Sequence, residues 1–472
     1  MRFFIFLSAF LLCTNAAKAE LTLLEAVQFS HENNPELKAQ NYSVEAARSQ
    51  KQKAYGGFLP NVSADINSGN QKTKIAEGSV IKGGANKKSI NLSQDLFNGG
   101  ASYFDVKRAG SVVSKEQAIK DAKEQEITLN VIQSYLNILR YEELLKVEQD
   151  NLQSQATMLD HTRIKLAARD ATKSEFAKAA ADYASAISSK IAVENNLLSA
   201  QTSFSKLTGI ATAEIGVLKK INDESFSSRI NDLNSNDLYE AALQNNPDVR
   251  AAKHAVESAK HQSSITKSSF SPTVKFTAGS SEEKNPLYYG NRSYHNNSVY
   301  LNLHVPIFSS GVEYANMGEA NNILQREKYN LDAARNRVKQ QIAEYVNKIK
   351  NFYAQYESLK EQESANEIYV KTLKEEERLG TKSIIELLRA KQDLYSAKVN
   401  KTNIHYDKIT AIFSLKSLVG ALTYDMLGGG DMLSNFDEKT GNAVEEEVVA
   451  SPVAQAPSEL KKVRYKFSTT SF

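Results

Sequence analysis

The heptapeptide Asn33-Asn34-Pro35-Glu36-Leu37-Lys38-Ala39 recurs as Asn245-Asn246-Pro247-Asp248-Val249-Arg250-Ala251, at an offset of 212 residues. Three further pairs of segments match in the same order, at an offset of 211 or 212: Phe58-Leu59-Pro60 with Phe270-Ser271-Pro272, Leu96-Phe97-Asn98-Gly99-Gly100 with Ile307-Phe308-Ser309-Ser310-Gly311, and Leu207-Thr208-Gly209 with Leu418-Val419-Gly420. Ordered matches at a nearly constant offset indicate internal repeats. The chain is therefore two copies of one structural unit.

Each unit is predicted to contain very long helices. No proline, the strongest helix breaker, lies in residues 61–246 or 307–451. Apolar residues recur there at steps of three and four, and a run at steps of seven is formed by Leu145, Leu152, Leu159 and Leu166. This spacing is typical of helices that pack as coiled coils. A helix over residues 101–168 is roughly 100 Å long at about 1.5 Å per residue, so its partners must be other long helices.

Four segments alternate apolar and polar residues. The clearest runs from Ser298 to Ile307, where one face carries Val299, Leu301, Leu303, Val305 and Ile307. A period of two indicates strands with one apolar face and one wet face. Two polar segments, residues 69–88 and 281–297, are expected to join the strands of each pair as loops, like the long external loops of outer-membrane barrels.

Such strands fit either a soluble sheet packed on helices or a barrel that faces lipid. Four strands cannot close a barrel, and an open sheet edge in lipid leaves backbone hydrogen-bonding groups unsatisfied. The smallest common membrane barrel has about 8 strands. If the sheet lies in a membrane, several chains must share one barrel, with two as the minimum and three giving twelve strands.

The N-terminus has the features of a secretory signal peptide. Arg2 precedes an apolar run, and Ala17-Lys18-Ala19 is a small-x-small cleavage motif, so residues 1–19 are predicted to be removed. The single cysteine, Cys13, lies in this segment, so no disulfide is expected. The formal net charge of +3 on 472 residues gives no electrostatic argument for a nucleic-acid partner.

Enzymatic activity is not expected. The seven histidines are scattered, and the two nearest, His254 and His261, are too far apart for the usual His-x-x-x-His metal pair. The sequence contains no phosphate-binding loop, nucleophile elbow or dinucleotide fingerprint. We therefore predict no catalytic residues, no cofactor and no metal site.

The chain resembles the TolC family of outer-membrane efflux channels. The resemblance rests on the repeated segments quoted above and on Gly380-Thr381-Lys382-Ser383-Ile384-Ile385-Glu386-Leu387, and it covers about residues 21–425. It implies a mainly α fold with a membrane β-barrel contribution, in which a homotrimer forms a twelve-stranded barrel on an α-helical periplasmic tunnel. It further implies a passive exit duct for drug efflux or type I protein secretion. The implied partners are outer-membrane lipid, a periplasmic adaptor protein and an inner-membrane pump.

The same resemblance implies a gate at the periplasmic tip. Position by position, the acidic gate residue falls on Glu175, its basic partner on Lys382 and the first ring carboxylate on Glu386. Two positions depart from the family pattern: Arg389 stands where a second ring carboxylate is expected, and Glu377 stands where a tyrosine is expected. A double acidic ring that binds cations is therefore not expected in this chain.

The predicted organisation follows the repeat. The first unit covers residues 20–209 and the second 237–425, separated by an inter-repeat segment at 210–236 that the resemblance places in a belt around the tunnel; residues 426–472 are expected to form a flexible tail. In the first unit the predicted strands and long helices lie at about 61–70, 89–97, 101–168 and 174–207. Those of the second unit lie at about 272–280, 298–308, 312–379 and 383–419.

A periplasmic coiled-coil adaptor, or a structural protein of an export system, is the alternative function. Such a protein is also exported and rich in coiled coil. An adaptor is expected to have one helical hairpin flanked by Gly-rich β-domains, whereas this sequence has the hairpin arrangement twice.

Overall fold

The structure is a computed structural model that describes residues 21–74, 78, 80–221, 234–284 and 292–422. The predicted signal peptide and the predicted C-terminal tail lie outside the described residues. The first repeat comprises α1 (Leu23–Asn33), α2 (Pro35–Tyr55), η1 (Gly56–Phe58), β1 (Asn61–Lys74), β2 (Val80–Asn98), α3 (Ala101–Ala167) and α4 (Lys173–Thr208), and η2 (Thr212–Glu214) follows in the inter-repeat segment. The second comprises α6 (Ser235–Asn245), α7 (Pro247–Ser268), β3 (Thr273–Lys284), β4 (Tyr294–His304), α8 (Val312–Arg378) and α9 (Ile384–Val419).

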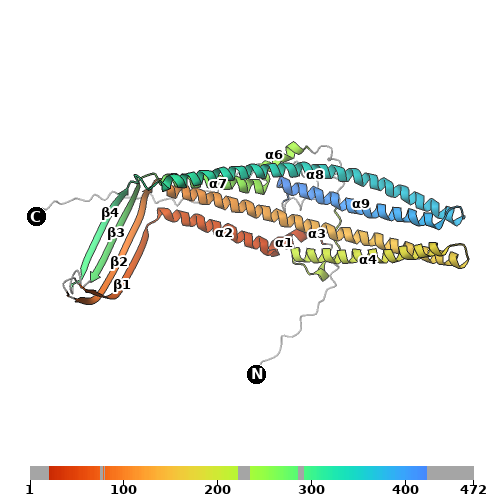
Figure 1. Cartoon of the computed structure of the whole chain (residues 1–472), viewed down its shortest axis with the longest axis horizontal. Coiled ribbons are helices and arrows are strands. Elements are labelled where there is room, and N and C mark those ends of the chain that lie inside the picture. Colours follow the sequence, from red (N-terminus) through yellow and green to blue (C-terminus); the bar gives the residue numbers. More distant parts are fainter. Residues whose placement is uncertain (1–20, 75–77, 79, 222–233, 285–291, 423–472) are drawn as a thin grey trace, which may run out of the picture.

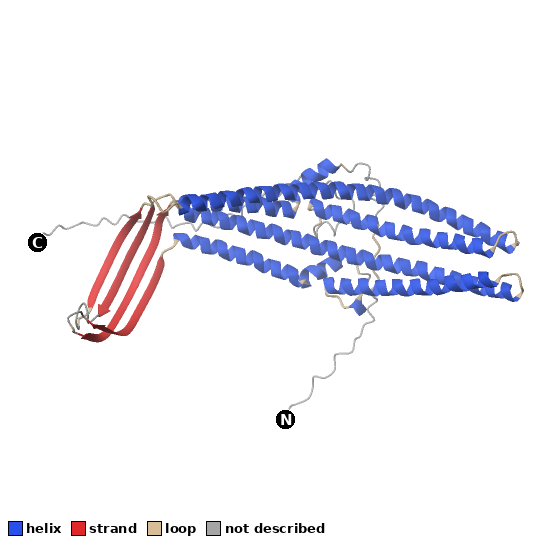
Figure 2. Ribbon diagram, in the orientation of Figure 1, coloured by secondary structure: helices blue, strands red, loops and turns tan. Residues whose placement is uncertain are grey.

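The two repeats form one elongated body. The sheet lies at one end, and the turns of the α3–α4 and α8–α9 hairpins lie together at the opposite end (Figure 1). Long helices account for most of the length between them (Figure 2). The 67 residues of α3 and the 67 of α8 match the lengths predicted from the proline-free stretches.

The repeated Asn-Pro segments begin helices α2 and α7. The side chain of Asn34 accepts hydrogen bonds from the backbone N–H groups of Glu36 and Leu37, at 2.8 and 3.4 Å. Asn246 does the same for Asp248 and Val249, at 3.0 and 3.1 Å. A side-chain oxygen at the N-cap satisfies N–H groups that have no partner within the helix, and proline is tolerated at the next position.

The four strands form one antiparallel sheet in the order β1-β2-β3-β4. The central pairing, β2 with β3, joins the two repeats. The register places apolar residues in rows across the sheet, for example Val62, Leu92, Ala278 and Val299. The alternation read from the sequence thus produces one continuous apolar face.

The first strand pair is longer than predicted, and the expected loop at residues 69–88 is wrong. Strand β1 continues to Lys74 and β2 begins at Val80, with an unbroken register from Asn61↔Ser93 to Lys74↔Val80. Backbone pairing needs no apolar side chains where both faces contact water, so the strands continue after the alternation has ended. In the second pair, β4 ends at His304, earlier than predicted, because Pro306 has no N–H to donate to a ladder.

The largest buried cluster lies at the middle of the helical body. Its fully buried side chains include Ile132 and Tyr135 of α3, Phe204 of α4 and Phe413 of α9. The described part of the inter-repeat segment packs here, since Leu218 belongs to the cluster and Leu21 pairs with it in a parallel bridge. The Tyr135 hydroxyl lies 2.9 Å from the Leu21 carbonyl oxygen and 2.7 Å from that of Lys219. Helix α1 and the inter-repeat segment are therefore fastened to α3 about halfway along the body.

Candidate functional site

The tips of the two helical hairpins are related by the repeat. At an offset of 211 residues, Arg169 corresponds to Gly380, Thr172 to Ser383 and Glu175 to Glu386. Arg169 has φ +65° and Gly380 has φ +76°, so both turns use a left-handed residue. That conformation costs a side-chain-bearing residue about 1 kcal/mol more than glycine. The first turn therefore reaches the same geometry at a cost in strain.

Glu175 caps its own helix. The backbone N–H of Thr172 donates to the Glu175 carboxylate at 2.6 Å, and the N–H of Glu175 donates to the Thr172 hydroxyl at 3.2 Å. This reciprocal pair is a capping box, and it begins α4. Within the described residues of one protomer, Glu175 forms no ion pair with Lys382.

Lys382 and Glu386 are brought together. Their charged atoms lie 3.1 Å apart, and both side chains are about half exposed. The hydrogen bond that Lys382 donates to the Glu386 carboxylate raises the pKa of Lys382. The backbone N–H of Glu386 also donates to the Ser383 hydroxyl at 3.3 Å, so Glu386 takes part in the cap of α9. Arg389 is exposed, and no ion pair to it occurs among the residues that the structure describes.

One ion pair between the hairpins was not predicted from the sequence. Lys165, near the end of α3, pairs with Glu377, near the end of α8. The Glu377 side chain is only 5% exposed and that of Lys165 is 31% exposed. A buried carboxylate depends on such a partner, because desolvation of an unpaired charge is costly. The signal for this pair in the sequence was that Lys165 and Glu377 carry opposite charges and lie at similar distances from the turns that follow α3 and α8.

Near this end of the hairpins, buried apolar side chains form a cluster between the helices. Met158 of α3 and Leu373 of α8 are both buried in it. Helix α9 contributes the remaining buried members, Ile384, Leu387, Leu388 and Ala390. Burial of a side chain of this size contributes about 1.5–3 kcal/mol. The hairpins are therefore held together near their tips by packing as well as by the Lys165–Glu377 pair.

Above the tips, a row of polar contacts links α3 to α9. The contacts, in order toward the tip, are Arg140 to Asp407 at 2.5 Å, Tyr406 to Glu143 at 3.0 Å, Tyr395 to Glu148 at 2.6 Å and Lys391 to Ser154 at 2.9 Å. Burial raises the pKa of both tyrosines and lowers that of Lys391. A cavity of about 170 Å³ lies beside this row and is lined in part by Asp150, Val370 and Lys391. These contacts join the two hairpins of one protomer along much of their length.

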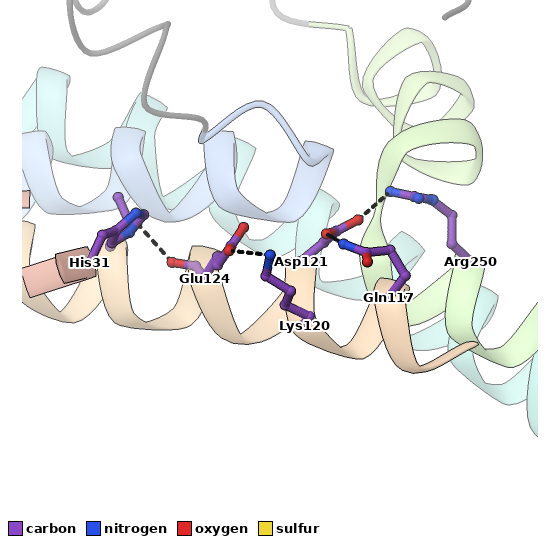
Figure 3. Close-up of polar contacts among 7 residues, drawn as sticks. His31, Gln117, Lys120, Asp121, Glu124 and Arg250 are labelled. Carbon is purple, nitrogen blue, oxygen red and sulfur yellow. Dashed lines mark hydrogen bonds and ion pairs between the residues drawn. The ribbon is translucent and has the colours of Figure 1, made fainter. Parts of the chain in front are cut away.

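A second polar group lies on α3 nearer its start, which follows β2. Arg250 of α7 donates to Asp121 at 3.0 Å, and Lys120 pairs with Glu124 at 3.3 Å (Figure 3). His31 of α1 lies at the other end of this group, with its Nε2 2.8 Å from the Thr128 hydroxyl. Burial lowers the pKa of His31, against the attraction of Glu124. Helices from both repeats are thus anchored to α3 by charged and polar groups.

Neither a metal centre nor a membrane-crossing helix is found in the described ranges. No group of three or more His, Cys, Asp or Glu side chains among them is arranged to hold a metal ion. None of the helices described has the length and apolar character needed to cross a membrane.

Known proteins share this architecture over nearly its whole length. The chain is 23% identical to the outer membrane protein TolC of Vibrio cholerae, covering 89% of this chain and 95% of the relative. It is 22% identical to the alkaline protease secretion protein AprF of Pseudomonas aeruginosa, covering 88% and 87%. The crystal structure of the Campylobacter jejuni CmeC outer membrane channel superposes with a TM-score of 0.74 at 19% identity, covering 88% of this chain and 87% of that one.

The sequence model of a family described as "Outer membrane efflux protein" matches residues 26–210 and 238–421. These two segments coincide with the two repeats and make up most of the chain. The match confirms the resemblance to TolC, the predicted outer-membrane location, the efflux function and the absence of an enzymatic role, and it favours a channel over the alternative of an adaptor. The chain belongs to the outer membrane efflux protein family.

Proposed function

We propose that three copies of this chain form a twelve-stranded barrel in the outer membrane, continued into the periplasm by a tunnel of their long helices. The assembly acts as a passive exit duct. Cargo enters from an inner-membrane pump through a periplasmic adaptor protein, in tripartite efflux, type I protein secretion or both. The description of the family, outer membrane efflux protein, supports the first route, and the name of AprF, a protease secretion protein, supports the second.

The proposal of a trimer rests on the sheet, with its unpaired edges and its exposed apolar face. In the described residues β1 and β4 each pair on one side only. The apolar face is bare in the single chain, where Leu301 is 67% exposed and Val62 is 64% exposed. Unpaired edges are not tolerated in the hydrocarbon of a bilayer, and four strands are too few to close on themselves. Pairing β4 of one copy with β1 of the next removes both edges, and three copies give twelve strands.

The gate at the tips has two parts in this proposal. Within each protomer, the Lys165–Glu377 pair holds the α8–α9 hairpin against α3. Next to the α8–α9 turn, Lys382 and Glu386 form a second pair. Arg389 follows Glu386 on α9, and Glu175 holds the position equivalent to Glu386 at the start of α4. A docked adaptor that binds the separated hairpins better than the closed ones shifts the population toward the open duct.

Reconstitution in a planar bilayer tests the proposal. We expect the purified protein to insert and to give discrete channels of low conductance, consistent with a closed tip. Loosening the tip by Lys382→Glu is expected to raise the single-channel conductance. A protein that inserts but never conducts, with or without this substitution, contradicts the duct function.

A further inference from the structure

The outward face of the sheet changes character along the strands. From Val62 to Ile66 in β1, every second residue on this face is apolar, and the neighbouring strands place Ile90, Leu92 and Val299 beside them. From the level of Ile66, whose register partner is Lys88, the same face becomes basic. It carries five exposed lysines, Lys72, Lys74, Lys82, Lys88 and Lys284.

The register fixes these lysines on the apolar side. The β1–β2 ladder has no bulge between Asn61↔Ser93 and Lys74↔Val80, so even-numbered residues of both strands share one face throughout. Asn86 pairs with Lys284, which places that lysine on the same face. Among the described strands, the acidic residue on this same face is Glu282.

Charges on the opposite face are matched with partners. Lys87 lies 3.7 Å from Glu283, and Lys275 lies 3.3 Å from Asp95. Asp65, also on that face, accepts a hydrogen bond from Asn91 at 3.0 Å. By contrast, the ion pairs found within the described ranges include none of the five outward lysines. The positive charge is therefore concentrated on one side of the sheet.

Two of the outward lysines directly face each other. Lys72 is the register partner of Lys82, and Lys74 is the next residue on the same face. Like charges directly opposite in a ladder destabilise it. A bound anion removes this repulsion, so the arrangement itself points to an anionic ligand.

We propose that this basic face binds the phosphorylated headgroup of a glycolipid. The glycolipid lies in the membrane leaflet at the end of the sheet where β1 ends and β2 begins. The inference rests on the proposed function, in which the apolar band crosses the outer membrane. Lys72 and Lys82 lie six residues beyond Ile66, which is about 20 Å along a strand and roughly 14 Å in height at a tilt of about 45°. An ordinary phospholipid headgroup is too thin to reach this level. A glycolipid with phosphates on its sugars, such as lipopolysaccharide, reaches it and matches the charge.

The test measures binding of lipopolysaccharide with a phosphorylated inner core to the full-length protein in detergent. Lys72→Gln/Lys82→Gln is compared with Lys87→Gln/Lys275→Gln, which removes the same charge from the opposite face. We expect the first variant to lose at least about tenfold in affinity, since each lysine near an anionic surface contributes measurably, and the second to stay within about twofold of wild type. Lys72→Glu, which places opposite charges in register, should lose binding without loss of stability.

One control compares different sources of phosphate. A second distinguishes failure of this inference from failure of the proposed function. Lipopolysaccharide lacking the core phosphates, phosphatidylglycerol and inorganic phosphate should each bind more weakly than the phosphorylated glycolipid. Equal binding of any of them, or equal loss in both double variants, overturns the inference. The oligomer mass of each sample is measured in parallel: a conducting trimer without selective binding refutes this inference alone, whereas failure to form a trimer refutes the proposed function and this inference with it.

Discussion

Lys165 of α3 and Glu377 of α8 form an ion pair that joins the two hairpins of one protomer next to their tips. The two residues are separated by 212 positions in the chain, and the carboxylate is almost completely buried. Because α3 belongs to the first repeat and α8 to the second, the pair connects the two halves of the duplication at the end remote from the sheet. An opening of the tip that moves the α8–α9 hairpin away from α3 must break this contact.

Neutralising one partner of this pair should open the tip. Lys165→Gln leaves Glu377 buried without its cation, which we expect to cost about 1–2 kcal/mol, less than for a fully buried pair because Lys165 is partly exposed. Single-channel conductance in a planar bilayer should increase. The charge swap Lys165→Glu/Glu377→Lys should restore much of the closed behaviour, and a swap that conducts as freely as Lys165→Gln would show that the pair does not hold the tip.

Reversing the charge of Lys382 should also raise conductance. Lys382→Glu replaces the attraction to Glu386, 3.1 Å away, by repulsion next to the α9 turn. Lys360→Glu is the matched control, since Lys360 has a comparable contact with Glu357 on α8, away from the turn, at 3.9 Å. Bilayer recordings should show larger or more frequent openings for Lys382→Glu alone. Identical traces for the two variants would remove Lys382 from the gate.

The two interpretations of Glu175 predict different results. As a cap residue it is replaceable by glutamine, which also serves in a capping box. Glu175→Gln should then leave conductance unchanged, while Glu175→Ala destabilises the start of α4 by about 1 kcal/mol. Protection of the first turn of α4 in hydrogen exchange measures the second effect. An increase in conductance with Glu175→Gln would instead support the gate role that the TolC resemblance implies.

Stability should depend on pH through His31. Burial holds its pKa below the ordinary value of about 6.5, so below that pH the unfolded chain binds a proton more readily than the folded one. The stabilising effect of the neutral ring is complete above about pH 6.5 and is lost as the pH falls through the folded pKa. Thermal unfolding followed by circular dichroism at pH 7.5 and 5.5 should show a smaller pH effect in His31→Gln than in wild type. His304→Gln, at an exposed position in β4, is the control, and an equal reduction in both variants would contradict the assignment.

Arginine substitutions at adjacent positions of β4 should distinguish the two faces of the sheet. Leu301 lies on the apolar face and Tyr300 on the other. A lipid-facing arginine near the membrane midplane costs about 2–4 kcal/mol, so Leu301→Arg should sharply reduce the amount of assembled protein in outer-membrane fractions. Tyr300→Arg should assemble nearly as well as wild type. The opposite ranking would place the wrong face in lipid.

The long helices and the repeat were predictable because they depend on local and periodic features. The predicted helix at about 312–379 is found as Val312–Arg378, since proline exclusion and apolar spacing act along the chain itself. The extent of β1 and β2 was not predictable, because beyond Ile66 most residues on both faces are polar and the pattern of period two disappears. The Lys165–Glu377 pair was also missed, because contact between two helices far apart in sequence is set by how they pack. Of the four predicted gate residues, Lys382 and Glu386 form an ion pair. Glu175 is instead hydrogen-bonded to Thr172, the N-cap residue of its own helix.

The number of chains in the assembled pore is the central claim. Native mass spectrometry of the full-length protein, released from detergent or from lipid nanodiscs, measures it directly. We predict a complex of three identical chains that keeps bound lipid and dissociates only on heating. A single chain or a pair, soluble in water and without bound lipid, would contradict the shared barrel and the duct that depends on it.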